Sequence, residues 1–498
     1  MRQLPCYNSR DKKPSLSMSV KRKIAFNTGM QLAGRMIATV IGLVTVAVMT
    51  RHLGRDGYGG FTTVLSFLQF FAILAGFGLP ITTAKLLSRA GADERSIMSN
   101  AFALRLVSGL GLFALAPLLG MLFPYSPEIK LGILVGTLSF LGMTLQELLV
   151  AVFQRHLVTW QIAFAEIAGR AVLLGGTAVA VVTGHGLIWI VAALAAGNLL
   201  QFALSWLMAR RFTRIGLAFD FTVWKEILRE SWPIGISIAF NLLYLRGDVI
   251  LLSVMRTQGE VGLYGAAYKV LDVVTVLPYI FMGLVLPLLS AAWSRGDRDD
   301  FNRKLSLSFD FLALIGLPLM FGSFAVSEGL MTLIAGPDFA AAGPFVSMLM
   351  VGGLAIFWHA LYGNALVAIG QQRRMVIWYA VNAAVSVGLY LLLIPRIGGL
   401  GAAAVTAFSE LFIAVAVTAT VTPLTGFRPD FVQLIKALVA SVIMFVIVWL
   451  LPDLQVLLRI GLGAVIFVGL LAALRGLPIK SIKSILIDRP EAKPPVDL

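Results

Sequence analysis

Apolar stretches long enough to cross a membrane recur from one end of this sequence to the other. A transmembrane helix needs about 20 predominantly apolar residues, which predicts an all-α polytopic membrane protein with about fourteen transmembrane helices. With 58% hydrophobic and only 13% charged residues, a chain of 498 residues is too apolar to be soluble. The predicted spans are 24–50, 59–87, 99–123, 130–153, 160–182, 187–208, 232–255, 262–293, 304–325, 344–369, 375–394, 400–422, 434–451 and 457–475.

Lysine and arginine are distributed unevenly between alternate loops. If the N-terminus is cytoplasmic, thirty of the 40 basic residues fall on that side, Arg105 among them, and six fall on the other. Cytoplasmic loops of membrane proteins carry an excess of Lys and Arg, so both termini are predicted to be cytoplasmic. The same bias explains the net charge of +15 without nucleic-acid binding. The remaining four basic residues lie within predicted helices: Arg35, Arg170, Arg246 and Lys269.

Two segments that follow the first helix of each half resemble one another. The sequence RHLGRDGYGGF at 51–61 and the sequence RTQGEVGLYGAAY at 256–268 share an Arg, three glycines and a tyrosine, with one inserted residue. A third and less similar copy, RIGGLGAAA, occupies 396–404. Both main copies fall on the same predicted side of the membrane, which indicates a parallel repeat and two pseudo-twofold six-helix lobes.

The repeat suggests where the domains begin and end. We predict a basic cytoplasmic tail (1–23), an N-lobe (24–208), a cytoplasmic linker (209–231), a C-lobe (232–422), a further helix pair (423–475) and a cytoplasmic tail (476–498). The run at 24–50 is too long for a signal-peptide core and is interpreted as a retained helix. The single cysteine, Cys6, excludes an intrachain disulfide and a cysteine metal cluster.

The segment 232–295 contains four charges within two apolar runs: Arg246, Asp248, Lys269 and Asp272. Ionisable residues inside a membrane are costly and mark a functional site by default. Residues two apart on a helix are separated by about 200°, so Arg246 and Asp248 point to opposite sides and need other partners. The nearest outside partners for the two residues are Asp272, Arg35 or an anionic ligand. For Arg246 the alternatives are a substrate pathway or an interhelical ion pair, and for Asp248 the same two alternatives are evenly balanced.

Two pairs of embedded charges have the spacing of same-face ion pairs. Glu166 and Arg170 are four residues apart, and Lys269 and Asp272 are three apart. Each pair is either self-neutralised or part of a substrate site. We predict Arg246, Arg35, Lys269 and Arg170 as substrate-binding residues, and Asp248, Asp272 and Glu166 as coupling-ion residues. Because Arg binds phosphate and carboxylate well, the excess of bases predicts an anionic substrate.

Other embedded polar residues give weaker signals. Glu147, Asp310 and Glu410 are isolated acids in or near helices, and His359 is the one histidine that falls inside a predicted helix. They are either proton or cation sites or simply packing residues. The sequence has no zinc-ligand spacing, Walker A loop, nucleophile elbow or dinucleotide fingerprint, so we expect neither an enzyme nor a bound metal or cofactor.

Several motifs together resemble those of one transporter family. They are TRHLGRDGYGGFTTVLSF, FGLP at 77–80, SWPIGIS at 231–237, and LRGDVILLSVM followed by VGLYGAAYKVLD. Their order and spacing are similar to the polysaccharide transporters, or Wzx-type oligosaccharide flippases, of the MATE-like superfamily. The similarity covers about residues 20–475.

The resemblance implies two lobes around a V-shaped cavity and alternating access. It implies transfer of an undecaprenyl-diphosphate-linked oligosaccharide across the inner membrane of a bacterium, for exopolysaccharide, capsule or O-antigen synthesis. Expected partners are that substrate, membrane lipids, and a polysaccharide polymerase or export proteins. Arg35, Arg246 and Lys269 are the candidates to meet the diphosphate. Coupling to a proton or sodium gradient, through Asp248 or Asp272, is a further hypothesis.

Several other functions remain open from the sequence. A MATE-type drug/cation antiporter would share the lobes but present unpaired acids, and a peptidoglycan-precursor flippase would share both lobes and charge. A scaffold in an export complex is a third alternative. A membrane polymerase, ligase or acyltransferase usually needs a large outward loop, and the longest one predicted here is only 325–343.

Overall fold

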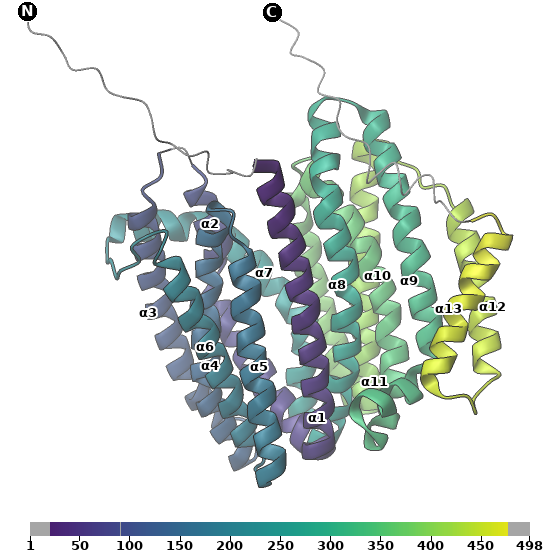
Figure 1. Cartoon of the computed structure of the whole chain (residues 1–498), viewed down its shortest axis with the longest axis horizontal. Helices are drawn as coiled ribbons and strands as arrows, with labels where there is room; N and C mark the ends of the chain where they lie inside the picture. Colours follow the sequence, from purple (N-terminus) through teal and green to yellow (C-terminus); the bar gives the residue numbers. More distant parts are fainter. Residues whose placement is uncertain (1–19, 90, 477–498) are drawn as a thin grey trace, which may run out of the picture.

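A computed structural model describes residues 20–89 and 91–476. The described chain is almost entirely helical, and eleven of its helices are long and apolar enough to cross a membrane. The predicted all-α membrane fold is thus confirmed (Figure 1). The helices are α1 (Val20–Gly76), α2 (Leu79–Leu87), α3 (Glu94–Gly120), α4 (Pro127–Arg155), α5 (Trp160–Thr183), α6 (Leu187–Ala209), α7 (Phe221–Met255), α8 (Gln258–Ser294), α9 (Arg298–Ala335), η1 (Pro337–Ala342), α10 (Gly343–Ala368), η2 (Gln372–Arg374), α11 (Met375–Thr425), α12 (Val432–Trp449) and α13 (Val456–Ala473).

Two of the long helices are interrupted by a single glycine with left-handed backbone. Gly54 in α1 has φ 65° and ψ −172°, and Gly398 in α11 has φ 58° and ψ −136°. Only glycine adopts such angles at little cost, so the chain changes direction there without leaving a loop. α1 and α11 each contain two apolar stretches, so each of them can cross the membrane once or twice. The predicted count of fourteen crossings therefore stays a prediction.

Other predicted boundaries differ from the structure because charged or short helical segments escape a search for apolar runs. The predicted linker 209–231 is partly helical, since α7 already begins at Phe221. The predicted outward loop 325–343 is filled by the end of α9 and by η1. The predicted tails, 1–23 and 476–498, lie almost wholly outside the described residues, as does Cys6.

The three copies of the glycine-rich turn meet at one end of the bundle, at the bottom of Figure 1, and we call this the glycine-turn end. The turn of α1 lies directly on the start of α8: a Cβ atom added to Gly59 would lie 1.8 Å from the Gln258 carbonyl oxygen. A Cβ atom added to Gly262 would lie 2.1 Å from the Arg55 carbonyl oxygen. Small residues allow such close approach between membrane helices. The first two copies of the repeat therefore touch backbone to backbone.

The third copy is held to the second by a carboxylate. Glu260 accepts a hydrogen bond from the Gly399 amide at 2.7 Å, and its other oxygen accepts one from Arg256 at 2.8 Å. A side chain at Gly398 would collide with Glu260, because a Cβ atom there would lie 1.9 Å from its Oε1 atom. The break in α11 is thus fixed by the turn between α7 and α8.

Further contacts join the N-lobe (α1–α6) to the C-lobe (α7–α11) at the glycine-turn end. Arg51 donates hydrogen bonds to the Leu333 and Ile334 carbonyls of α9, at 2.7 and 2.8 Å. Tyr125 is hydrogen-bonded to Ser253 of α7 at 2.9 Å. These bonds satisfy groups at helix ends that would otherwise lack partners. The lobes are therefore firmly connected at this end.

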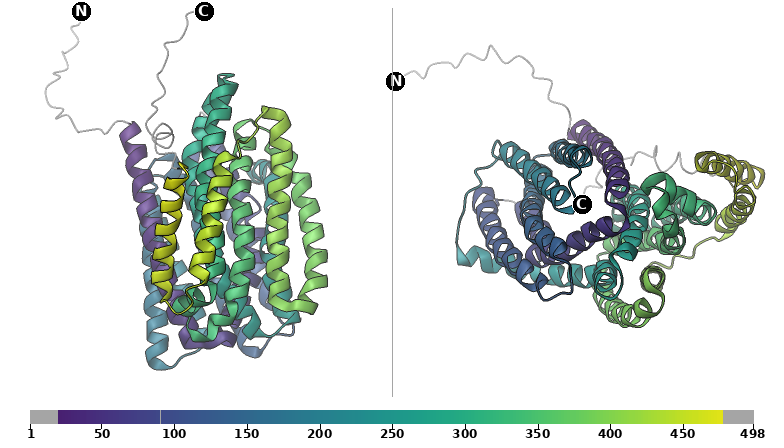
Figure 2. Two further views of the ribbon diagram at one scale, coloured as in Figure 1. Left: turned by 90° about the vertical axis from the view of Figure 1, so that its right-hand side faces the viewer. Right: turned by 90° about the horizontal axis from the view of Figure 1, so that it is seen from below.

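The apolar core shows the same asymmetry. At the glycine-turn end one continuous cluster spans both lobes, with Val64 and Ile133 from the N-lobe and Tyr264 and Leu349 from the C-lobe. Towards the opposite end the core divides into two. One cluster includes Leu148 of the N-lobe and Ile227 of α7, and a separate one lies in the C-lobe. The views in Figure 2 show the two helix groups from the side and from below, with α12 and α13 beside α9.

At the opposite end the N-lobe meets the first turns of α7. Lys85 donates to Glu230 at 2.6 Å, and Arg89 pairs with Glu226 and Glu230 at 2.8 and 3.0 Å. The hydrogen bond from Lys85 holds the pKa of Glu230 below its usual range, and the charges of Lys85 and Arg89 add to this effect. These charged groups are largely exposed, so their ion pairs contribute little. The N-lobe also meets α7 closely at Gly235, where a Cβ atom would lie 2.9 Å from the Phe77 carbonyl carbon.

Candidate functional site

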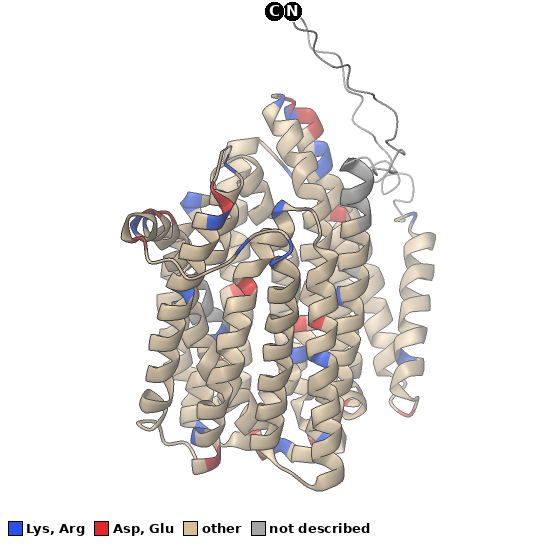
Figure 3. Ribbon diagram, turned by 60° about the vertical axis from the view of Figure 1, so that its left-hand side comes forward, with Lys and Arg blue, Asp and Glu red and all other residues tan. Residues whose placement is uncertain are grey.

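A cavity of about 330 Å³ lies between α1, α5, α6 and α8. Its walls are mainly apolar, as at Leu43, Val46 and Leu194. Five residues predicted as substrate or coupling residues nevertheless line it: Arg35, Glu166, Arg170, Lys269 and Asp272. Acidic and basic residues also stand out at mid-height of the bundle in Figure 3. The structure thus brings together charges from helices that are far apart in the sequence.

Arg35 is the cavity base with the fewest protein contacts. It lies on the first part of α1 and is exposed. Over residues 20–89 and 91–476, no acidic side chain forms an ion pair with it. A guanidinium inside a membrane protein needs water or an anion to offset its desolvation. Arg35 therefore brings a positive charge to the cavity that no acidic side chain of residues 20–89 and 91–476 pairs with.

Glu166 and Arg170 form the predicted pair on α5, with Glu166 Oε1 3.1 Å from Arg170 Nη2 and 3.2 Å from Nε. The pair lies against α1 at Gly42, where a Cβ atom would be 2.7 Å from Arg170 Nη1. Gly42 therefore provides the space in which the guanidinium reaches the cavity. The pair is nearly neutral and contributes hydrogen-bond donors rather than net charge.

Asp272 is shared by two bases. It accepts from Arg246 of α7 and from Lys269 of α8, both at 3.1 Å. The guanidinium of Arg246 also lies over the ring of Tyr268, 4.5 Å from its centre, which is a favourable cation–π arrangement. Of the two alternatives for Arg246, the structure contains the pair with Asp272. One acid with two bases leaves this triad with a charge of +1.

Arg246 and Lys269 also line a smaller pocket of about 60 Å³. It shares Phe61, Leu65 and Lys269 with the main cavity and adds Gln69 and Ser66 from α1. The two pockets together contain four basic side chains, Arg35, Arg170, Arg246 and Lys269, and two acidic ones, Glu166 and Asp272. Four positive and two negative charges leave a net charge of +2, which suits a ligand with two negative charges.

Asp248 points away from these pockets, as the helical spacing predicts. Its carboxylate is fully buried between α7, α8 and α11. It accepts hydrogen bonds from the Tyr264 hydroxyl at 2.5 Å, the Val249 amide at 2.7 Å and the Thr406 hydroxyl at 3.2 Å. Its partners are thus neutral donors, which sequence reasoning missed, although Tyr264 belongs to the repeated turn.

Two charged residues are corrected by the structure. Arg105, counted among the cytoplasmic loop charges, is buried inside the N-lobe, and Glu147, described as isolated, is its partner at 3.1 Å. Arg105 also donates to the Thr144 carbonyl at 3.2 Å. The two residues lie on neighbouring helices, so no spacing rule along one helix reveals them. The loop count of bases falls by one, which does not alter its bias.

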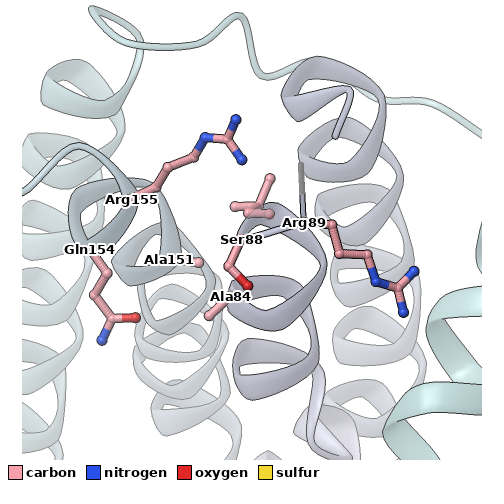
Figure 4. A pocket seen from close by; sticks show the side chains of 7 residues that line it. Ala84, Ser88, Arg89, Ala151, Gln154 and Arg155 are labelled. Carbon is pink, nitrogen blue, oxygen red and sulfur yellow. The ribbon is translucent and has the colours of Figure 1, made fainter. Parts of the chain in front are cut away.

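A second polar pocket, of about 390 Å³, lies between the ends of α2 and α4. Arg89 and Arg155 are on opposite sides of it, and Figure 4 shows Arg89 pointing away from Arg155. Arg155 pairs with Glu94 at 3.0 Å, while Arg89 pairs with acids of α7. Since both bases are engaged, this pocket lacks the excess charge of the cavity between the lobes.

Comparison with known proteins places the chain in a family. The sequence profile described as "Polysaccharide biosynthesis protein" matches residues 22–293, more than half of the chain. The chain belongs to the polysaccharide biosynthesis protein family. This confirms the resemblance drawn from its motifs. The match covers the N-lobe, the Gly59 and Gly262 turns, and the part of α8 that carries Lys269 and Asp272.

Named relatives of this family member span most of its length. It is 24% identical to the probable low-salt glycan biosynthesis flippase Agl15 of Haloferax volcanii, over 78% of this chain and 80% of that protein. It is 24% identical to the succinoglycan biosynthesis transport protein ExoT of Rhizobium meliloti, over 84% of this chain and 83% of that one.

The fold of this family member is found among solved structures. The lipid II flippase MurJ in an inward closed conformation superposes with a TM-score of 0.75. The superposition covers 92% of this chain and 99% of MurJ, with 16% sequence identity. At this level of identity the likeness establishes the shared architecture and leaves the substrate to be argued from the cavity.

Proposed function

We propose that this protein transfers a lipid-linked oligosaccharide from one leaflet of the cytoplasmic membrane to the other, for synthesis of a surface or secreted polysaccharide. The observation that carries the proposal is the net charge of +2 in a cavity of a multi-pass membrane protein. An undecaprenyl diphosphate head group carries negative charges that guanidinium groups bind bidentately. The relatives named as a flippase and a transport protein support the same reading.

Alternating access is the proposed mechanism. The lobes are joined at the glycine-turn end, which the charge bias predicts to be the outer side. In this state the cavity would open towards the cytoplasm, and Arg35 and Arg246 would receive the head group while the lipid tail stays in the bilayer. Separation at Gly59 and Gly262 would then open the outer side. We propose that both termini are cytoplasmic and that the protein acts beside a polymerase or export proteins.

The charge of the cavity also ranks the alternatives. A drug/cation antiporter requires acids that are free to bind a cation, whereas Glu166 and Asp272 are both engaged by bases. A peptidoglycan-precursor flippase would need the same positive cavity, because its substrate carries the same kind of diphosphate. Of these two alternatives, only the peptidoglycan-precursor flippase is compatible with the pockets. Complementation tests would separate it from the proposal, one in a strain that lacks its polysaccharide flippase and one in a strain that lacks its peptidoglycan-precursor flippase.

Replacing Arg35 by alanine should lower polysaccharide export by about tenfold. A hydrogen bond to a charged group contributes about 1.5–3 kcal/mol and about 1.4 kcal/mol is tenfold, and we expect the low end because Arg35 is exposed. Export would be measured per unit of membrane protein in a strain that lacks its own copy. Arg396→Ala is the matched control, because Arg396 bonds only to the Leu392 carbonyl of its own helix within the described residues. Wild-type export by the Arg35 variant would refute the cavity role.

We further propose that an ion gradient drives transport. Asp248, Asp272 and Glu166 are the candidates for coupling that the sequence offers. Each of these acids already has donors in this conformation, so an ion would have to displace Tyr264, Arg246 or Arg170 respectively. Flipping in proteoliposomes should respond to an imposed proton or sodium gradient. A rate that is the same with and without either gradient would argue against coupling.

A further inference from the structure

A histidine and a glutamate face each other inside the C-lobe, away from the cavity. His359 lies on α10 and Glu410 on the second half of α11, with His359 Nδ1 3.5 Å from Glu410 Oε2. Their side chains are 14% and 2% exposed. On its other side, His359 Nε2 is 3.3 Å from the hydroxyl of Tyr379, on the first half of α11. The imidazole therefore connects the two halves of the broken helix.

The pair is close but not hydrogen-bonded. A separation of 3.5 Å is longer than an N–H···O hydrogen bond, which is usually about 2.7–3.2 Å. His359 Nδ1 is buried without a hydrogen-bond partner within residues 20–89 and 91–476. Leaving a buried polar group unsatisfied is costly. The arrangement thus differs from a purely structural hydrogen bond and leaves both groups free to change their protonation.

The other titratable groups around the pair cannot neutralise Glu410. Four phenols lie close enough to interact with its charge: Tyr379 and Tyr390 of α11, and Tyr268 and Tyr279 of α8. Asp310 of α9 interacts instead with Asp430. Among the described residues His359 is the one basic group in ion-pair distance of Glu410.

A single proton keeps this pair neutral overall, whether it resides on the carboxyl or makes the imidazole cationic. Without it, a bare carboxylate would remain in an apolar interior, which costs several kcal/mol. With a second proton, an imidazolium would be left without a counter-ion. Hard cations such as sodium require oxygen ligands, so the unsatisfied imidazole nitrogen favours a proton over a metal ion.

We propose that His359 and Glu410 form a proton-binding site, and that transport is coupled to the proton gradient through it. In the conformation described here the pair would retain one proton, because both side chains are largely shielded from solvent. Movement of α10 against α11 would admit water, stabilise the carboxylate and release the proton. Proton binding stands by itself, whereas its coupling to transport rests on the proposed function.

Proton binding is tested on the purified full-length protein in nanodiscs. The sequence contains only four histidines, so ¹⁵N-histidine labelling gives few signals, and His359→Gln identifies the signal of His359. In wild type the ¹⁵N signals of the His359 ring should change with pH as the pair gains or loses its proton. In Glu410→Gln the midpoint of this change should differ from that of wild type, because the partner that shares the proton is gone. An unchanged midpoint would overturn the site.

Coupling is tested in proteoliposomes with undecaprenyl-diphosphate-linked oligosaccharide extracted from the host strain. Wild-type flipping should change at least about fivefold with an imposed pH gradient, and Glu410→Gln should lose this response. Asp310→Asn, which removes an embedded acid outside the pair, should keep it. If Glu410→Gln fails to fold, Glu410→Asp and His359→Gln serve in its place, and both should weaken the response.

The outcomes separate the two claims. A shifted His359 midpoint with a normal gradient response in Glu410→Gln would retain the proton site and overturn the coupling. Absence of flipping by wild-type protein, together with the shifted midpoint, would refute the proposed function and leave the proton site intact.

Discussion

Replacing Gly262 by alanine should lower polysaccharide export by at least about a hundredfold. The added methyl group would lie 2.1 Å from the Arg55 carbonyl oxygen and 3.0 Å from the Gly59 amide nitrogen. Overpacking usually costs about 1–3 kcal/mol, and the cost here should be at the upper end or beyond because main-chain atoms cannot rotate away. About 1.4 kcal/mol changes an equilibrium constant tenfold, so this cost lowers the population of the state closed at the glycine-turn end by about a hundredfold or more. Transport cycles that pass through this state become correspondingly rare.

The matched control is Gly283→Ala, on the same helix α8. A Cβ atom at Gly283 meets nothing within 4 Å, so export should stay at the wild-type level. Gly59→Ala should reproduce the defect of Gly262→Ala, because its methyl group would lie 1.8 Å from the Gln258 carbonyl oxygen. The measurements are export per unit of membrane protein and the thermal midpoint of the purified protein. Normal export by both variants would show that this contact is not needed for transport.

Replacing Asp272 by asparagine should strongly destabilise the protein. The change leaves Arg246 and Lys269 without their shared counter-ion and raises the charge of the triad from +1 to +2. Breaking a buried ion pair costs about 3–5 kcal/mol, and we expect about 2–3 kcal/mol because the three side chains keep partial contact with water. Less protein should accumulate in the membrane, and its thermal midpoint should fall.

A second substitution tests the charge argument directly. Asp272→Asn combined with Lys269→Gln restores a charge of +1, so the thermal midpoint should recover in part. A double variant that is no more stable than Asp272→Asn would mean that the loss of stability comes from packing rather than from uncompensated charge.

Apolar runs predict the membrane-spanning segments because the bilayer requires about 20 apolar residues whatever the tertiary structure. The same rule misses the start of α7 at Phe221, which is amphipathic, and η1, which is short. It does place the boundaries between predicted spans around Gly54 and Gly398, where a glycine with left-handed backbone turns the chain between two helical segments. Hydropathy records length and composition, but it contains no information on backbone direction.

Charge pairs along one helix were predictable, and those between helices were not. Glu166 with Arg170 follows from helical periodicity alone. The pairs Arg105 with Glu147 and His359 with Glu410 depend on which helices are neighbours, which a single sequence does not contain. The opposite directions of Arg246 and Asp248 were derivable, whereas the donors around Asp248 come from three separate segments.

The contact between Gly59 and Gly262 has a consequence for how this protein can evolve. Most helix contacts are made by side chains, so a larger residue on one helix is tolerated once a smaller one appears on the other. Here both contact residues are glycines, so the main chains touch directly and neither residue has a side chain that could become smaller. No compensating substitution exists, so divergent sequences that keep this mode of closure should keep both glycines while the residues around them drift.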